Sequence, residues 1–445
     1  MGQGLLGLPP GGAGGDAAGR SCEPKPFDLR KLGDQRARFR PATMEAPVPM
    51  PVTGADYKWM NLMMRTPLKS IPKIIRRVVQ GMGGLAIKRE YSAGGQAIAG
   101  GMYAGVLNAG IPVWTETSIV ELVTDERGAV TGAVVEQQGR RATVTARKGV
   151  VLAAGGFDHN RKLRREHQSE RYYDNLSLGS EGNTGDTLAM AEGVGAELAN
   201  LDQAWWFPAV APVAEGQAPS ILLAERSLPG SMIVDQTGKR FINEATDYMS
   251  FGQEVLRREQ EGDPVTDIWL IFDQQYRNSC VFAGGIFPRM ALPDAWYEAG
   301  IAHKAESIGE LANGIGVDRS TLKSTLDRFN LIAGAGVDED FQRGHSAYDR
   351  YYGDPTQTPN PNLRPLGGTL YAVKMVVSDL GTCGGVMTDE FGRAVKESGE
   401  VIEGLYAQGN AAANVFGHSY PGAGATISQG LVYGYIIAKH AAEAR

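Results

Sequence analysis

The sequence predicts an α/β fold in which a parallel-sheet domain with a Gly-rich, ligand-binding edge is interrupted by an inserted α+β domain. The run GVVLAAGG at residues 149–156 is typical of a strand buried on both faces of a parallel sheet. Ligands of such sheets bind beyond the carboxyl ends of the strands, where Gly155 and Gly156 lie. Near Asp202 the composition changes to Trp pairs, Pro, Tyr and longer loops, and Gly-rich sequence returns at residues 404–445.

Composition narrows the function classes. The chain has 445 residues, 42% of them hydrophobic, and its 44 Lys and Arg against 50 Asp and Glu give a net charge of −6. This length predicts two or three domains at about 150 residues each. A nucleic-acid partner is not expected, because it requires a basic stripe. The three cysteines lie far apart and the six histidines lack metal-ligand spacing, so we expect no metal site and a reducing, cytoplasmic compartment.

The N-terminus and two uncharged runs bear on targeting. Residues 1–19 are rich in Gly and Pro and lack the basic and apolar regions of a signal peptide, which predicts either a disordered lead-in or a start placed inside a longer natural chain. Residues 92–115 and 404–438 carry no Lys, Arg, Asp or Glu, but Gly, Asn, Gln and Pro interrupt them. A membrane span needs about 20 predominantly apolar residues, so we expect none. These runs suit backbone that lies close to a bulky buried ligand.

Hydrophobic periodicity predicts the remaining local structure. Basic and apolar residues at helical spacing over residues 67–79 predict an amphipathic helix with a solvated face. Residues 112–123 read as a strand, and the segments on either side of Gln138-Gly139 as a hairpin. The predicted helices are at residues 92–109, at 187–195, and from Thr426, as N-cap of a capping box with Gln429, to about residue 443.

The segment GLYAQGNAAANVFGHSYPGAGATISQ at residues 404–429 carries the chemistry. A short strand ends at Gly409-Asn410, a loop of small residues follows, and the last helix begins after Gly424. Free N–H groups at a helix start favour anionic or carbonyl oxygen, and the glycines let the backbone approach a flat ring system. An ordinary Gly-rich loop before a helix is the alternative interpretation.

The sequence resembles the FAD-dependent 3-ketosteroid Δ1-dehydrogenases, relatives of the fumarate reductase flavoproteins. The resemblance runs from about residue 20 to the C-terminus, and HSYPGAG distinguishes this family from the fumarate reductases. Its motifs include RSCEPKPFDLRKLG (20–33), VLAAGGFDHN (151–160), NTGD (183–186), DQAWWFP (202–208), GKRFINEA (238–245), WLIFDQQYR (269–277), GVDEDFQRG (336–344), SAYDRYYGDP (346–355), PNPNL (359–363) and HSYPGAGATI (418–427).

The chain departs from the family at its start. The family opens with a strand and a GxGxxG turn that holds the FAD pyrophosphate on a helix N-terminus. No GxGxxG after an apolar run occurs here, and GGAGG at residues 11–15 does not qualify. The expectation is therefore an FAD-binding domain that is incomplete at its N-terminus and lacks a tyrosine that assists the family's base. The implied domains are 20–203 with 380–445 for FAD and 204–379 for catalysis.

The resemblance also implies residue roles. The hydroxyl of Tyr420 and the backbone N–H of Gly424 match the donors to the substrate ketone, and Tyr248 matches the base that removes a proton. Because a tyrosine pKa is about 10, this base needs help from its surroundings. The implied flavin contacts are Val120, Ala154, Gly155, Gly156, Asn183, Gly185, Asp186, Gly409, Asn410, Thr426 and Ile427.

Several of these residues keep a second interpretation. Asp186 also suits a helix N-terminus, where a carboxylate is stabilised by the positive end of the helix dipole. Trp205, Trp206, Phe207, Phe282 and Phe287 could line an apolar pocket or be ordinary core aromatics. His418 is a candidate base, but we expect it to orient its loop or fill space.

The predicted activity is the flavin-dependent 1,2-dehydrogenation of a 3-oxosteroid in steroid catabolism, with an external electron acceptor as second partner. Two rivals stay open. One is a cofactor-less remnant or steroid-binding protein without turnover, which the missing GxGxxG supports. The other is a fumarate reductase-like or Δ4-steroid flavoenzyme, against which HSYPGAG argues.

Overall fold

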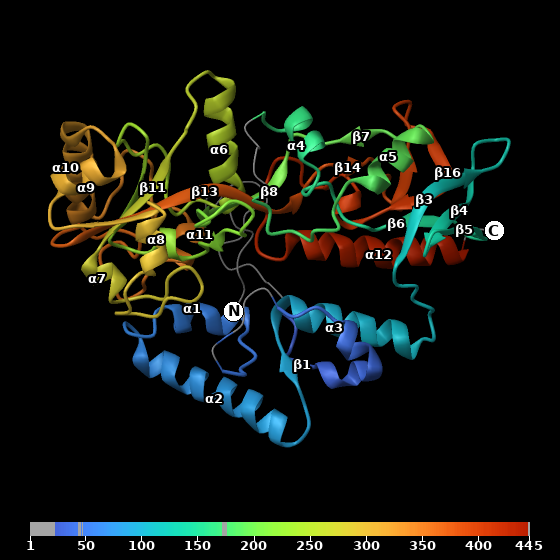
Figure 1. Ribbon diagram of the computed structural model, residues 1–445, viewed down its shortest axis with the longest axis horizontal. Coiled ribbons are helices and arrows are strands. Elements are labelled where there is room, and N and C mark those ends of the chain that lie inside the picture. Colours follow the sequence, from blue (N-terminus) through green and yellow to red (C-terminus); the bar gives the residue numbers. More distant parts are fainter. Residues whose placement is uncertain (1–22, 43–45, 47, 171–175, 444–445) are drawn as a thin grey trace. The chain divides into compact units, whose positions relative to one another are not determined.

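The computed structural model describes residues 23–42, 46, 48–170 and 176–443 (Figure 1). The expected disordered lead-in, residues 1–19, lies outside them. The described chain divides into two compact units. The first contains the described residues up to Val113 together with Ser220–Thr246 and Val265–Met375. The second contains Trp114–Pro219, Asp247–Pro264 and the described residues from Val376 onward. The predicted division separates an FAD-binding domain, residues 20–203 with 380–445, from a catalytic domain, residues 204–379. This division by function stays a prediction.

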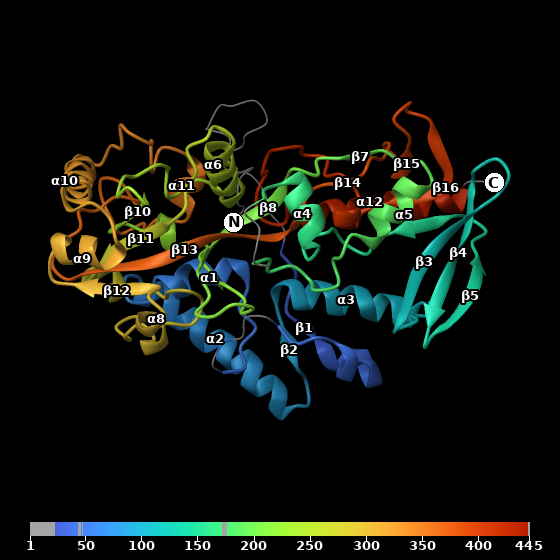
Figure 2. The ribbon, with the colours of Figure 1, turned by 45° about the horizontal axis from the view of Figure 1, so that its top comes forward.

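An antiparallel sheet covered by helices forms the core of the first unit. Strands β10 (Ser231–Asp235), β11 (Ile268–Asp273) and the first part of β13 (Leu370–Thr382) pair in that order, and β12 (Ala302–Ala305) also pairs with β13. Helices α9 (Ile308–Ile315) and α10 (Arg319–Ala335) lie beside this sheet (Figures 1 and 2). Leu311, Leu322 and Phe329 from these helices are fully buried with Val234 and Ile271 of the sheet.

The other elements of the first unit are mostly short. A two-stranded pairing of β1 and β2 accompanies the N-terminal helices. The bounds are β1 (Phe27–Asp28), η1 (Leu29–Arg38), α1 (Gly54–Asn61), α2 (Pro67–Ala86), β2 (Tyr91–Ser92), α3 (Gly94–Asn108), β9 (Ser220–Ile221), η2 (Glu225–Ser227), α7 (Gln274–Arg277), α8 (Asp294–Glu298) and α11 (Ala347–Tyr351).

The second unit holds the predicted parallel strand pair. Strand β6 (Val150–Leu152) pairs in parallel with β16 (Val401–Ala407), which confirms the α/β class, and β15 (Arg393–Val395) adds to β16 in the antiparallel sense. Its remaining elements are β3 (Thr117–Thr124), β4 (Val130–Gln137), β5 (Arg140–Thr145), α4 (Arg161–His167), α5 (Asp186–Gly193), β7 (Leu198–Ala199), β8 (Ala204–Val210), α6 (Tyr248–Gln260), β14 (Gly385–Val386), η3 (Gly409–Ala411) and α12 (Ala425–Glu443).

The predicted hairpin is confirmed. Strands β4 and β5 pair antiparallel, and the two residues between them, Gln138 and Gly139, have φ of 50° and 74°. Two consecutive residues with positive φ are the mark of a type I′ turn, whose twist matches that of the flanking strands. The preceding strand is shorter than predicted, because β3 begins only at Thr117 and not at residue 112.

Two local predictions in the second unit are wrong. Strand β6 is not buried on both faces, because Val151 is 43% exposed. The capping box at Thr426 does not form either. Helix α12 begins at Ala425, so Thr426 lies inside its first turn and is not the N-cap, and the side-chain oxygen of Gln429 accepts a hydrogen bond from the backbone N–H of Val415 (3.3 Å). This hydrogen bond ties Gln429 to the loop that precedes the helix and holds that loop in place.

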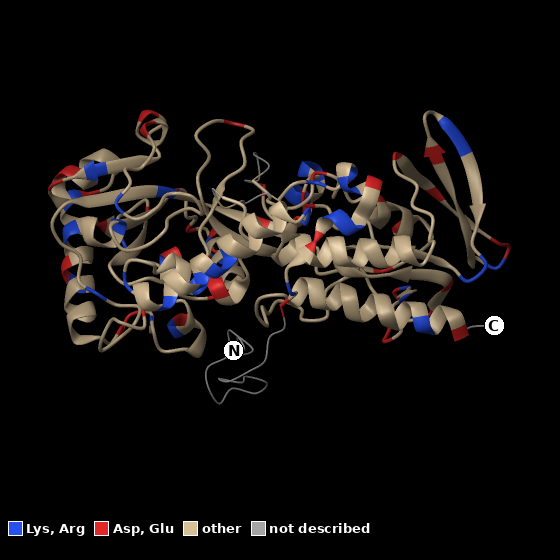
Figure 3. Cartoon of the chain, turned by 90° about the horizontal axis from the view of Figure 1, so that it is seen from below, with Lys and Arg blue, Asp and Glu red and all other residues tan. Residues whose placement is uncertain are grey.

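The predicted amphipathic helix forms but faces the opposite way. Helix α2 continues to Ala86, and its outward side is apolar instead of charged: Leu68 is 92% exposed and Val79 64% exposed. Lys and Arg are interspersed with Asp and Glu in the view of Figure 3. Among the described helices, none has the length and apolar character to cross a membrane.

Candidate active site

Two tyrosines that are far apart in the sequence meet in the second unit. Tyr248 is the first residue of α6, whose N-cap Asp247 accepts a hydrogen bond from the backbone N–H of Ser250 (2.9 Å). Tyr420 lies in the loop before α12. The Tyr248 hydroxyl donates a hydrogen bond to the Tyr420 hydroxyl, and the ring centroids are 4.2 Å apart. Both side chains are buried, so the pair forms a polar spot within apolar surroundings.

Strand β8 supplies the aromatic support for this pair. Side chains two residues apart on a strand share one face. Accordingly, Trp205 contacts Tyr420 edge-on at a centroid distance of 6.3 Å, and Phe207 contacts Tyr248 at 4.9 Å. Trp206 points to the other face, where a Cβ added to Gly252 of α6 would lie only 2.3 Å from it. Strand β8 and helix α6 are therefore closely packed, which holds Tyr248 in place.

The loop that carries Tyr420 is tied to the same helix. The side-chain amide of Gln253, on α6, donates to the backbone oxygen of His418 (2.8 Å) and to the side-chain oxygen of Gln203 (2.9 Å). His418 itself is exposed and lies 3.6 Å from a carboxylate oxygen of Asp202. The side chain of His418 thus points to the surface, in line with a role in the loop and not as a base.

Gly424 presents an open backbone donor. It has φ of +90°, and a Cβ added there would find only the Ser428 hydroxyl, 4.0 Å away. Within the described chain, its N–H and those of Thr426 and Ile427 in the first turn of α12 have no acceptor. Gly424 and Ile427 are exposed. Such a set of unpaired donors favours an incoming oxygen.

The two glycine motifs after β6 and before α5 are joined. The N–H of Gly185, which precedes α5, donates to the oxygen of Gly156 (3.1 Å). A Cβ added to Gly155 would lie 2.2 Å from the Asn183 side-chain oxygen, and one added to Gly156 would lie 1.9 Å from the Thr382 hydroxyl. These glycines are therefore required by the close approach of neighbouring side chains, while Ala154 beside them is exposed.

Sequence reasoning missed a buried polar network behind this turn. Arg164 donates to Asp379 (2.6 Å), and the hydroxyl of Ser177 donates to Asp379 (2.7 Å) and to Asp158 (3.2 Å). The Asn183 amide also donates to Asp158 (3.2 Å). Burial, reinforced by the Asp379 charge, raises the pKa of Asp158. The available signal was the position of Asp158, two residues after the glycine pair.

The remaining predicted flavin residues lie on separate elements of the same unit. Val120 is the extra residue of a β-bulge in β3, between the paired Ile119 and Glu121. Bulges are frequent beside active sites. Asp186 is the exposed first residue of α5. Gly409 has φ of +63° with nothing within 4 Å of an added Cβ, and the Asn410 side-chain oxygen accepts from the Trp205 indole (3.3 Å).

These residues fit a flavin. Gly409 and Gly424 leave open space against the backbone, the start of α12 offers unpaired donors, and Ile427, Leu431 and Val151 present exposed apolar side chains. Apolar surface with a few convergent donors is what binding sites for planar cofactors require. No grouping of three or more His, Cys, Asp or Glu that could hold a metal ion occurs in the described parts of the chain.

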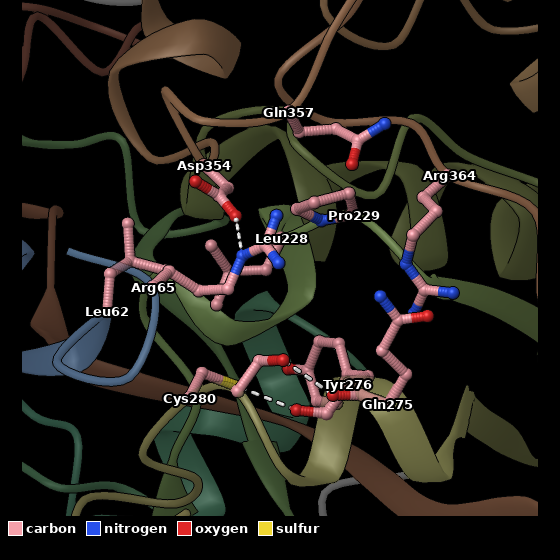
Figure 4. A pocket seen from close by; sticks show the side chains of 11 residues that line it. Leu62, Arg65, Leu228, Pro229, Gln275, Tyr276, Cys280, Asp354, Gln357 and Arg364 are labelled. Carbon is pink, nitrogen blue, oxygen red and sulfur yellow. Dashed lines mark hydrogen bonds and ion pairs between the residues drawn. The ribbon is translucent and has the colours of Figure 1, made fainter.

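A pocket in the first unit is a poor substrate site (Figure 4). Its cavity of about 20 Å³ is lined by residues that include Leu62, Tyr276 and Cys280, and has room for one water molecule. Its rim is held by the ion pair of Arg65 and Asp354 (2.9 Å). Phe282, a candidate pocket residue in the sequence, packs in the core of this unit against Phe272, at a centroid distance of 5.1 Å.

Comparison with known proteins identifies the family. The family model described as FAD binding domain matches residues 5–427. The 3-oxosteroid 1-dehydrogenase of Mycobacterium tuberculosis is 40% identical over 98% of this chain and 78% of its own length. The 4-oxocyclohex-2-ene-1-carboxylate 5-dehydrogenase of Sinomonas cyclohexanicum is 34% identical over 95% of this chain and 72% of its own length.

A solved structure agrees with these sequence matches. The 3-ketosteroid Δ1-dehydrogenase of Sterolibacterium denitrificans, solved in complex with 1,4-androstadiene-3,17-dione, superposes with a TM-score of 0.88 at 33% identity. The match covers 97% of this chain and 79% of that one. The chain therefore belongs to the 3-oxosteroid 1-dehydrogenase family of FAD-binding flavoproteins.

Proposed function

We propose that this protein is an FAD-dependent 3-oxosteroid 1-dehydrogenase, which forms a double bond between carbons 1 and 2 of a 3-oxosteroid. The observation that carries the proposal is the hydrogen bond between Tyr248 and Tyr420. Tyr420 stands four residues before Gly424, whose backbone N–H is open. Family membership supplies the reaction class. Loss of a proton from carbon 2 and of a hydride from carbon 1 leaves the new double bond.

Tyr420 and Gly424 would act on the ketone oxygen. A proton next to a ketone is weakly acidic until that oxygen is stabilised as it gains negative charge. One well-placed donor at such an oxygen lowers the barrier by about 3–4 kcal/mol. The phenol of Tyr420 and the N–H of Gly424 supply two donors of different kinds, separated by a rigid Pro-Gly turn. Their shared target would fix the position of ring A.

Tyr248 would remove the proton from carbon 2. With the Tyr420 proton directed at the ketone, the Tyr420 oxygen is left as an acceptor. Once Tyr248 has taken up the substrate proton, it can donate that proton to the Tyr420 oxygen through the hydrogen bond that joins the two hydroxyls. Before the steroid binds, a deprotonated Tyr248 would instead accept from Tyr420, whose single proton turns to the ketone once the substrate is present. The pair can therefore support both protonation states of the base by reversing one hydrogen bond.

The flavin would be held by the Gly-rich edge of the second unit. The proposed contacts are Val120, Ala154, Gly155, Gly156, Asn183, Gly185, Asp186, Gly409, Asn410, Thr426 and Ile427. When bound, FAD supplies the acceptor for the hydride. The chain's own contribution is to leave open backbone at Gly409 and Gly424 and to direct the α12 donors at the flavin's oxygens or nitrogens.

The surroundings of the tyrosine pair favour a steroid over a small carboxylate. The relative from Sinomonas cyclohexanicum is named for a cyclic ketone that carries a carboxylate, which requires a cation nearby. Here the neighbours of the pair are the aromatic side chains Trp205 and Phe207. Arg164 of the same unit is already bound to Asp379. An apolar, aromatic wall is suited to a fused-ring substrate.

The test is an anaerobic reduction experiment with the purified chain. After incubation with excess FAD and removal of unbound cofactor, 4-androstene-3,17-dione is added without an electron acceptor. We expect the flavin absorbance to bleach and the product to carry the new double bond between carbons 1 and 2. A protein that takes up no FAD, or binds steroid without bleaching, is the remnant. A double bond at carbon 4 from a saturated 3-oxosteroid identifies the Δ4 enzyme instead.

The reducing, cytoplasmic location expected from the sequence is also part of the proposal. Cys280 and Cys383, the two cysteines in the described part of the chain, are both buried thiols. Burial raises the pKa of Cys280 to about 12, so this thiol is protonated and unreactive at neutral pH. Fractionation of the source cells, with detection of the protein by antibody, tests the location.

A further inference from the structure

The segment that carries Tyr420, residues 413–424, runs from η3 to α12 and contains neither helix nor strand. We call it the Tyr420 loop. A side chain on such a loop is held less precisely than one on a helix unless its surroundings fix the backbone. The Tyr420 hydroxyl nevertheless meets the hydroxyl of Tyr248, which is carried by α6. Contacts between the Tyr420 loop and its surroundings must therefore set the position of Tyr420.

Two buried amide side chains hold the start of the Tyr420 loop. The side chain of Asn414 accepts from the N–H of Phe416 (2.8 Å) and donates to the backbone oxygen of Gly417 (3.0 Å). The side chain of Gln429, on α12, accepts from the N–H of Val415 (3.3 Å). These contacts fix the first turn of the loop, and the tyrosine lies further along the chain.

A side chain on α6 holds the next part of the loop. The amide group of Gln253 donates to the backbone oxygen of His418 (2.8 Å) and to the side-chain oxygen of Gln203 (2.9 Å), so both of its hydrogens are used. His418 lies two residues before Tyr420. Gln253 lies five residues after Tyr248, about 7.5 Å along the helix axis. One amide group therefore joins the helix of one tyrosine to the loop of the other.

The direction of these hydrogen bonds is set by a carboxylate, which can only accept when it is ionised. The side-chain amide of Gln203 donates to Asp202 (2.8 Å), and this turns the Gln203 side-chain oxygen toward Gln253. Gln203 is itself buried, and its backbone oxygen accepts from the N–H of Cys383 (3.0 Å) and the side chain of Gln168 (3.1 Å). Gln253 thus faces two oxygens and must donate to both.

We propose that Gln253 is a positioning residue for the proposed dehydrogenation, and that it holds the Tyr420 hydroxyl between Tyr248 and the substrate ketone. The inference rests on the proposed function and adds a residue that does not touch the substrate. Loss of the contact with the His418 oxygen would let the Tyr420 loop shift against α6. A displacement of about 1 Å at a reacting group can lower a rate about a hundredfold. A role in stability alone would instead leave kcat per folded site unchanged.

Hydrogen–deuterium exchange with mass spectrometry tests the contact in the purified chain, with no cofactor or steroid added. Gln253→Leu keeps the approximate size of the side chain but cannot donate. Backbone amides of the Tyr420 loop should exchange about fivefold faster in this variant, the equivalent of one lost hydrogen bond. Gln260→Leu, at the exposed last residue of the same helix, is the matched control and should exchange like the wild type. Equal exchange in Gln253→Leu and the wild type would overturn the proposal.

Steady-state turnover of 4-androstene-3,17-dione by the FAD-loaded protein tests the effect on the chemistry. We expect Gln253→Leu to lower kcat by between about tenfold and about a hundredfold, with KM nearly unchanged, and Gln260→Leu to change neither. When Tyr420→Phe is already present, Gln253→Leu should have little further effect, because the hydroxyl that it positions is gone. An unchanged kcat in the single variant, or a full additional loss in the double variant, would also overturn the proposal.

A second variant keeps the test decisive if circular dichroism shows that Gln253→Leu is unfolded. Gln253→Glu has nearly the same shape, but its carboxylate would direct an oxygen at the His418 oxygen. Its effects on exchange and on kcat should be at least as large, and wild-type values for both would contradict the proposed role. A wild-type chain that binds FAD without turning over the steroid would refute the proposed function alone, because the exchange measurement still decides whether Gln253 holds the Tyr420 loop.

Discussion

Replacing Tyr420 by phenylalanine removes a single oxygen atom from the proposed site and leaves the ring. The ring packs against Tyr248 at 4.2 Å and against Trp205 at 6.3 Å, and both contacts are retained in the variant. Two things are lost: the hydroxyl that accepts from Tyr248 and the proposed donor to the substrate ketone. The substitution therefore separates the chemistry of the site from its packing.

The two losses have different sizes. The hydrogen bond from Tyr248 contributes about 1 kcal/mol to the free energy of unfolding, which is a small part of the total. A donor at an oxygen that gains charge in the transition state contributes about 3–4 kcal/mol. Tyr420→Phe should therefore lower kcat roughly a hundredfold to a thousandfold, with a shift of Tm that is small for a chain of this size.

The assay is steady-state reduction of an artificial electron acceptor by the FAD-loaded protein with 4-androstene-3,17-dione. Tyr406→Phe is the matched control. Tyr406 is also buried in the second unit, and its hydroxyl is 3.0 Å from the His440 ring nitrogen, remote from the proposed chemistry. We expect the same small loss of stability with unchanged kcat. Equal kcat values for Tyr420→Phe and wild type would refute the proposed role of the hydroxyl.

Two further predictions concern stability and cofactor content. Burial raises the pKa of Glu225 to about 7 from 4.5, so the folded state binds this proton more tightly. The free energy of unfolding should therefore fall by about 3 kcal/mol as the pH rises from about 4.5 to about 7; urea titrations should show this slope reduced in Glu225→Gln, and identical slopes would contradict it. A Cβ at Gly156 would meet the Thr382 hydroxyl at 1.9 Å, so Gly156→Ala should lower the FAD bound per chain, measured by absorbance, whereas Gly182→Ala, where the nearest atom is 3.9 Å away, should not. Equal FAD content in both variants would argue against the proposed cradle.

Local sequence patterns predicted the elements whose cause is local. The hairpin follows from the two turn residues Gln138 and Gly139, and the strand at β6 from a short apolar run before a glycine pair. The capping box failed because the side-chain oxygen of Gln429 instead accepts a hydrogen bond from the N–H of Val415, fourteen residues away in the sequence. Periodicity also found α2 but assigned its faces wrongly. Which side of an amphipathic helix is buried depends on the surface it meets, here the backbone at Pro49.

The candidate site shows the same limit. Tyr248 and Tyr420 are 172 residues apart, and no spacing rule connects their hydroxyls. The resemblance to a family supplied their roles, and the structure supplied their contact. The network around Asp158 and Asp379 was not predicted, because its members come from distant segments and each has an ordinary interpretation alone. Helix and strand periodicity describe local faces, whereas active sites are assembled from long-range contacts.

The most direct test of the central claim, that the tyrosine pair removes the proton next to the ketone, is hydrogen exchange at carbon 2. The FAD-loaded protein is incubated with 4-androstene-3,17-dione in deuterium oxide without an electron acceptor, and recovered steroid is analysed by NMR. The account predicts deuterium at carbon 2 with the wild type and with Tyr406→Phe, and a loss of this exchange with Tyr248→Phe. Exchange that proceeds equally well in Tyr248→Phe would contradict it.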